Sequence, residues 1–338
     1  MNASWGTRLA ALSLLTFMAG ACGGSPQPVA AKPSPTPLPP GHTAFFYSTA
    51  PDAPVKPVGW DGSTYASFGL GGLTGGPGIQ SPDGSKLLVG DAVFDRATGA
   101  VTQLGTVAGK GLQVMWADDS RHLCLLHPAG SSEQAGGTTS VLELLEPGMP
   151  AKTVAKVGHD EAQAFALLRS CSVTNDIAVV AQRAVLPISD VWAIRISTGE
   201  VVQHLAYAQG QQPGAVVVAS DGRWMAEVTT STSVVDLSSG AAVGHLDGAA
   251  VAFSSNGRVL VMEDRVVDWT TNRKLWSSPA GFSAAFVAGE PSTSTVAVDV
   301  MTGQGSAGQA PLSQLWLVAD SFVKHIADGA VPSFVTVN

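Results

Sequence analysis

The clearest grouping of metal-binding residue types in this 338-residue chain is a His-Cys pair beside two aspartates. His122 and Cys124 are two positions apart, which would place both side chains on one face of a strand, just after Asp118 and Asp119. A zinc site would need further ligands from elsewhere in the chain, whereas aspartates before a strand commonly cap turns. We therefore expect Asp118 and Asp119 to shape a turn, and we predict no metal site.

A glycine-rich segment at residues 303–308, GQGSAG, has the spacing of a dinucleotide-binding loop. Such a loop needs a helix directly after it, because the N-terminus of that helix holds the pyrophosphate. Pro311 and another strand-like run follow here instead. The sequence also lacks GxSxG, HExxH, P-loop and EF-hand motifs. We therefore assign no catalytic residue and no cofactor from the sequence.

The composition narrows the class of protein. Hydrophobic residues make up 45% of the chain and charged residues 13%, with a formal net charge of -8. Disordered chains are poor in apolar residues and rich in charge, so this chain is expected to fold. Nucleic-acid binding needs basic side chains to neutralise phosphates, so the acidic balance argues against a nucleic-acid partner.

The N-terminus has the pattern of an export signal. Residues 1–21 carry one charge, Arg8, followed by an apolar stretch too short to span a membrane. Its end, Ala19-Gly20-Ala21-Cys22, resembles the lipobox of bacterial lipoproteins, although Ala19 stands where leucine is usual. The resemblance implies cleavage before Cys22 and lipidation of that cysteine. Ordinary secretion and an uncleaved anchor are the alternatives.

Residues 22–41 are rich in proline, serine and alanine and carry a single charge, Lys32. Such a segment favours extended polyproline conformations and buries no core. We expect it to be a tether that holds a folded domain, residues 42–338, away from a membrane. The lipid on Cys22 would be the membrane contact. The expected location is extracytoplasmic, anchored to the cell membrane or the outer membrane of a bacterial envelope.

Two further cysteines, Cys124 and Cys171, each lie in an apolar strand-like run. Export would make a disulfide chemically permissible. The surrounding residues favour two buried thiols, and this is the expectation that we adopt.

The folded domain contains a repeated turn signal. Its copies start about 41 residues apart on average and precede short apolar runs: SPDG (81–84), ADDS (117–120), VTND (173–176), ASDG (219–222), SSNG (254–257) and AGEP (288–291). A second signal lies later in the unit: FDRATG (94–99), IRISTG (194–199), VDLSSG (235–240) and VDWTTN (267–272). Asp, Asn and Ser cap tight turns, and Gly accepts positive φ. Two hairpins per unit give four antiparallel strands, and units of this length indicate an all-β propeller.

The two turn signals are similar to those of the WD-repeat and TolB-like propeller families, over roughly residues 44–337. Gly158-His159 resembles the glycine-histidine dipeptide of WD repeats, and Phe94-Asp95 its aromatic-aspartate pair. The resemblance implies the fold and no functional subfamily. Because pairing the two chain ends would remove two exposed sheet edges, we expect seven blades, the last one shared by both termini. Six blades are the alternative.

Strand direction alternates within each unit, so the two repeated turns share one face and the longer loops share the other. We expect the short repeated turns to be structural, and a ligand to bind the loop-rich face and the channel mouth. The candidate binding residues are Glu161, Arg183, Asp190, Gln211 and Gln212. The expected function is a binding or scaffold module for a protein, peptide or cell-wall glycan. The alternative is a lyase-like or lactonase-like propeller enzyme with its site in the central channel.

Overall fold

The computed structural model divides the chain into residues Met1–Ser34 and Pro35–Asn338. It describes residues 36–39, 42–48, 54–69, 78–104, 112–129, 139–158, 164–184, 187–302, 313–329, 331–332 and 334–335, all in the second unit. The expected signal (1–21), Cys22, most of the tether and Glu161 lie outside the described residues. None of the described residues forms a helix with the length and hydropathy needed to cross a membrane.

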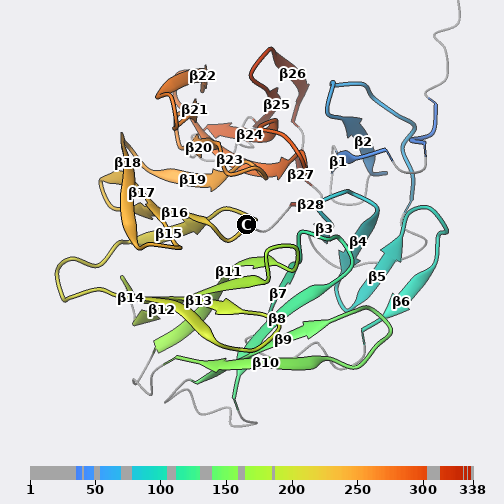
Figure 1. Ribbon diagram of the computed structural model, residues 1–338. Helices are drawn as coiled ribbons and strands as arrows, with labels where there is room; N and C mark the ends of the chain where they lie inside the picture. The colour runs from blue at the N-terminus through green and yellow to red at the C-terminus, as the bar shows by residue number, and fades with distance from the viewer. Residues whose placement is uncertain are drawn as a thin grey trace, which may run out of the picture. The chain divides into compact units, whose positions relative to one another are not determined.

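The described chain is all-β and forms a ring of antiparallel blades (Figure 1). Six blades each contain four consecutive strands, named a to d outward from the axis. Blade 1 contains β3 (Gly78–Gln80), β4 (Lys86–Val89), β5 (Ala92–Asp95) and β6 (Val101–Gln103); blade 2 contains β7 (Gln113–Trp116), β8 (Leu123–Pro128), β9 (Ser140–Leu145) and β10 (Lys152–Val157). Blade 3 contains β11 (Ala164–Ser172), β12 (Ile177–Ala184), β13 (Ile188–Arg195) and β14 (Val201–Ala206).

The second half of the ring repeats the same order. Blade 4 contains β15 (Ala215–Val218), β16 (Trp224–Val228), β17 (Ser231–Asp236) and β18 (Ala241–Asp247); blade 5 contains β19 (Ala250–Phe253), β20 (Val259–Met262), β21 (Arg265–Asp268) and β22 (Arg273–Ser277). Blade 6 contains β23 (Phe282–Gly289), β24 (Val296–Thr302), β25 (Ser313–Val318) and β26 (Val323–Asp328). The predicted propeller of four-stranded antiparallel blades is confirmed.

A further sheet joins strands from the two ends of the folded unit. We call it the closing sheet: β1 (Ala44–Ser48) pairs with β2 (Lys56–Gly59) on one side and with β27 (Val331–Pro332) on the other. Phe45 packs against blade 6, and Phe46, on the opposite face of β1, packs against blade 1. The closing sheet therefore fills the gap between the first and last blades.

The number of complete blades matches the six-bladed alternative. The expected seventh four-stranded blade is not found in the described part of the chain; strands from the two ends pair there in the three-stranded closing sheet instead. The last strand, β28 (Phe334–Val335), leaves the closing sheet and pairs in parallel with β3, on the axial edge of blade 1. Residues near the C-terminus therefore contribute to two neighbouring sheets.

The repeated turns form for the reasons that the sequence suggested. In the β3–β4 turn, the Ser81 hydroxyl donates to Asp83 at 2.7 Å and accepts from the Lys86 N–H at 2.9 Å. Gly84 has φ of 68°, and a Cβ there would lie 2.6 Å from the carbonyl oxygen of Ala44. In the β5–β6 turn, Asp95 accepts the N–H groups of Ala97 and Thr98. Side-chain capping and positive φ thus fix both hairpins of a blade.

The core lies between the sheets, where apolar residues of one blade face those of the next. Blades 2 and 3 share the cluster that contains Leu126, Leu168 and Trp192. In the same cluster, Cys124 of β8 and Cys171 of β11 form a disulfide, with their Cα atoms 6.2 Å apart. The expectation of two buried thiols was wrong. It failed because the approach of β8 to β11 depends on how two blades stack, which local sequence does not reveal.

Candidate functional site

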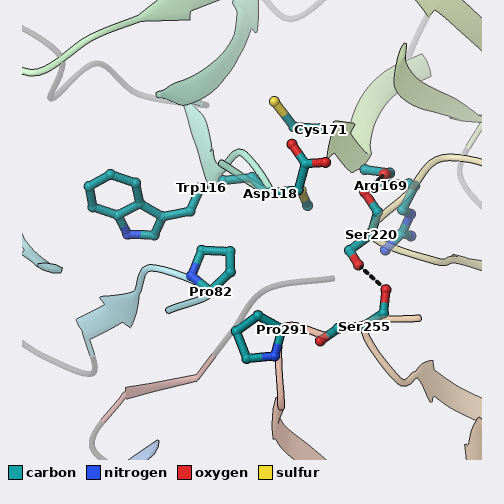
Figure 2. Close-up of a pocket in the computed structure, with 10 residues that line it drawn as sticks. Pro82, Trp116, Asp118, Arg169, Cys171, Ser220, Ser255 and Pro291 are labelled. Carbon is teal, nitrogen blue, oxygen red and sulfur yellow. Dashed lines mark hydrogen bonds between the residues drawn. The ribbon is translucent and has the colours of Figure 1, made fainter. Parts of the chain in front are cut away.

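A small pocket lies where the inner ends of the blades converge, among the turns that join the a and b strands (Figure 2). All six complete blades contribute to its lining, which consists of Pro82, Met115, Trp116, Asp118, Arg169, Ser170, Cys171, Ser220, Ser255 and Pro291. Four of these, Pro82, Asp118, Ser220 and Ser255, are the second residue of the repeated turn. The pocket is therefore at one mouth of the central channel.

Hydrogen bonds between neighbouring blades hold the rim of the pocket. The Ser220 hydroxyl donates to the Ser255 carbonyl at 2.9 Å, drawn in Figure 2, and the Ser170 hydroxyl donates to the Ala219 carbonyl at 3.0 Å. The Asp118 carboxylate accepts from the Ser172 hydroxyl at 2.7 Å and from the Thr174 N–H at 3.2 Å. Each bond joins one blade to the next, so the rim is fixed before a ligand arrives.

Arg169 is the cation of the pocket. It lies in β11 where the register with β12 shifts between Leu168 and Ser170, so Arg169 is the extra residue of a β-bulge. A bulge redirects a side chain relative to the regular alternation of a strand. The Arg169 Nε is inaccessible to solvent and has no hydrogen-bond partner within the described structure. Burial, and to a smaller extent the charge of Arg183, lower the pKa of Arg169.

The carboxylates near the pocket are engaged in turn structure. Both oxygens of Asp118 accept hydrogen bonds from blade 3. Asp221, the residue after Ser220, accepts from the Arg223 N–H at 2.9 Å. Burial raises the pKa of Asp221, and the charge of Asp118 acts in the same direction. The carboxylates of Asp118 and Asp221 are therefore hydrogen-bonded to residues of the turns and neighbouring strands.

The His-Cys grouping found in the sequence does not form a site. Cys124 is in the disulfide, and His122 is bonded through Nδ1 to Asp119 at 2.6 Å. Asp119 also accepts the N–H groups of Arg121 and His122, which is the turn-capping role that we expected. Among the residues with defined positions, no three His, Cys, Asp or Glu side chains are grouped to hold a metal ion.

The candidate residues from the loop-rich face do not line the pocket. Arg183 is the penultimate residue of β12, with its guanidinium 5.6 Å from the centre of the Phe165 ring. Asp190 is in β13 and contacts His204 Nε2 at 2.8 Å. Gln211 and Gln212 are in the link from β14 to β15, at the opposite end of the inner strand from Ser220. Glu161 is outside the described residues.

Sequence reasoning missed the residues that do line the pocket, because it treated the repeated turns as structural only. One signal was available. Arg169 is the only charged residue in the nine-residue apolar segment Ala164–Ser172, AFALLRSCS. A cation in an inner strand of a propeller needs a partner or a ligand.

No protein-family model matches the sequence, and no curated protein matches it. Solved structures with a similar fold include dihydro-heme d1 dehydrogenase NirN in complex with DHE, at 14% identity, with a TM-score of 0.47 and coverage of 91% of this chain and 78% of that one. A chain of the mitotic checkpoint complex is 12% identical, with a TM-score of 0.45 and coverage of 95% and 90%. This protein is a β-propeller. The similarity values assign no family and no activity.

Proposed function

We propose that this protein is an extracytoplasmic, lipid-anchored binding or scaffold module that engages a protein, peptide or cell-wall glycan. The observation that carries the proposal is the pocket at the channel mouth, to which every complete blade contributes a residue. Apolar walls with a few convergent polar groups are features of ligand sites, and at about 40 Å³ this pocket would take a small group of a larger partner. The ligand binds at this mouth.

The disulfide between Cys124 and Cys171 supports the extracytoplasmic location. Disulfides persist in oxidising compartments and are rare in the cytosol. This bond is buried between two blades, with both cysteines nearly inaccessible to solvent. Such a bond suits a structural role in an exported protein, in agreement with the export signal expected at residues 1–21.

The chemistry of the pocket lining favours binding over catalysis. Its ionisable side chains are Asp118 and Arg169, since Cys171 is disulfide-bonded. Asp118 is held by Ser172 and Thr174 and has no histidine or lysine beside it in the described lining. Acid–base catalysis needs a positioned proton donor or acceptor facing the substrate. We therefore place the propeller-enzyme alternative second.

Membrane attachment is tested by replacing Cys22 with alanine in the full-length chain and fractionating the cells. The wild-type protein should be recovered with membranes and extracted by detergent. The Cys22→Ala variant should leave the membrane fraction, because the acyl chains would be its anchor. Membrane recovery unchanged by Cys22→Ala would remove the lipid anchor from the proposal.

Binding is tested by co-sedimentation of the purified protein with peptidoglycan sacculi and by capture of solubilised envelope proteins. In Pro82→Trp the indole would fill the pocket from a turn position that tolerates most residues. The amount of this variant that co-sediments with sacculi or captures envelope protein should fall at least about tenfold. The control is the double variant Gln211→Ala and Gln212→Ala on the opposite face, which should bind as wild type. If the Pro82→Trp variant still binds and the Gln211→Ala, Gln212→Ala variant does not, the site is on the loop-rich face instead.

A further inference from the structure

Arg169 carries the one buried side-chain polar atom of the pocket lining that has no hydrogen-bond partner in the described structure. The Ser170 and Ser220 hydroxyls and the Asp118 carboxylate make the hydrogen bonds described above. The buried Nε of Arg169 has no acceptor among the described residues, and no ion pair joins its guanidinium to any of their carboxylates. A half-buried guanidinium without an acceptor is unfavourable until an anion reaches it.

The charges around Arg169 also leave its guanidinium without an anionic partner in the described structure. The protein carries a net charge of -8, yet the other charge acting on Arg169 is that of a second cation, Arg183. The carboxylate on the same rim, Asp118, accepts hydrogen bonds from Ser172 and Thr174 through its two oxygens and forms no ion pair with Arg169 among the described residues. Arg169 is therefore the cation of the pocket that has no carboxylate partner among the described residues.

The size of the pocket limits the group that enters. Its volume is about 40 Å³, enough for about three water molecules. A carboxylate contains three heavy atoms, and its planar shape matches the guanidinium fork in a bidentate pair. Pro82, Trp116 and Pro291 form apolar walls against which the carbon next to a carboxylate would pack.

We propose that Arg169 binds a carboxylate of the ligand, so that the partner presents an acidic group at the channel mouth. The inference rests on the proposed binding function and makes it more specific. The carboxylate could belong to a peptide or to a sugar acid, since both present the same group to Arg169. The experiment separates these two sources.

The test measures binding of small carboxylates to the full-length purified protein, by calorimetry and by tryptophan fluorescence, because Trp116 lines the pocket. The probes are N-acetylglycine for a peptide carboxylate and galacturonate for a sugar acid. N-acetylglycinamide, which has no carboxylate, and inorganic phosphate are the comparison compounds. We expect saturable binding of at least one carboxylate at millimolar concentrations, with the preferred probe identifying the source, and no binding of the amide.

Three variants locate the carboxylate. Arg169→Met keeps the length of the side chain without its charge and should weaken binding about ten- to hundredfold. Arg169→Lys keeps the charge but lacks the planar guanidinium fork, so its affinity for the carboxylate should lie between those of the wild type and Arg169→Met. Arg195→Gln removes an exposed arginine of the same blade that does not line the pocket, and it should bind as wild type. Melting temperatures confirm that each variant is folded.

Several results would overturn the inference. These are no carboxylate binding by the wild type, equal binding by folded Arg169→Met, or stronger binding of phosphate than of either carboxylate. The proposed function has a separate readout. If Arg169→Met still binds sacculi or envelope protein and Pro82→Trp does not, the carboxylate assignment is wrong and the binding function stands. If neither sacculi nor envelope protein binds the wild type, the proposed function itself is wrong.

Discussion

Cys124 of β8 and Cys171 of β11 are covalently joined across the interface between two neighbouring blades. Strands β8 and β11 also contribute residues to the apolar cluster that blades 2 and 3 share. The bond therefore links blades that otherwise adhere through packing and a few hydrogen bonds. Asp118 of the pocket rim is bonded to the same segment, since its N–H donates to the Cys171 carbonyl at 3.1 Å.

Reduction of this disulfide should destabilise the protein. The cysteines are 47 residues apart, and the loop-entropy relation gives about 4 kcal/mol for a loop of that length. Chemical denaturation with and without reductant measures the difference in the free energy of unfolding. The double variant Cys124→Ala and Cys171→Ala should be insensitive to reductant. A wild-type protein equally stable in both conditions would contradict the bond.

Asp268 should give the protein an acid-sensitive contribution to stability. Burial opposes ionisation, but hydrogen bonds from Thr270 and Arg258 outweigh it and lower the pKa of Asp268 from 3.8 to about 2. Because the folded-state pKa is the lower one, this stability is present above pH 4 and is lost as the pH falls toward 2. Asp268→Asn should reduce the free energy of unfolding at pH 7 by about 2 kcal/mol.

The difference between wild type and Asp268→Asn should shrink as denaturation is repeated from pH 5 to pH 2. Asp264→Asn is the control, because Asp264 is 68% exposed and pairs with Arg265 at the surface. Exposed ion pairs contribute about 0–1 kcal/mol, so the control should follow the wild-type curve. A pH-independent loss in Asp268→Asn would show that its hydrogen bonds, and not its charge, carry the effect.

Gly84 should tolerate alanine less well than Gly99 of the same blade. Both have positive φ, 68° and 71°, so both substitutions incur backbone strain of about 1–2 kcal/mol. A Cβ at Gly84 would also lie 2.6 Å from the Ala44 carbonyl oxygen of the closing sheet, whereas nothing lies within 4 Å at Gly99. Gly84→Ala should therefore lose about 1–3 kcal/mol more in denaturant unfolding. Equal losses would mean that β1 moves aside without penalty.

Arg169→Met should fold at least as stably as the wild type. The guanidinium is half-buried without an acceptor in the described structure, and an apolar side chain of similar length avoids that desolvation cost. We expect the free energy of unfolding to rise by about 1 kcal/mol while ligand binding is weakened, as is common when a functional residue is removed. A loss of more than about 1 kcal/mol would assign Arg169 a structural role.

The features predicted from the sequence are local ones. The Ser81 and Asp95 caps, the glycines at positive φ and the four-strand unit follow from residue types within a few positions of each other. The features that were missed depend on register or on contacts between blades. Arg169 lines the pocket at a bulge in the pairing of β11 with β12, and Cys171 meets Cys124 because two blades stack. Neither is encoded in spacing along the chain.

The closing sheet sets a condition on biosynthesis. β1 begins at Ala44, but its partner β27 begins at Val331. A nascent chain that has emerged only as far as Val318 contains most of its blades yet has no β27, so one edge of β1 stays open until Val331 and Pro332 have emerged. Unpaired strand edges invite pairing with other chains. Products that end before β27 are therefore expected to aggregate or be degraded, and only a chain that contains β27 becomes a closed ring.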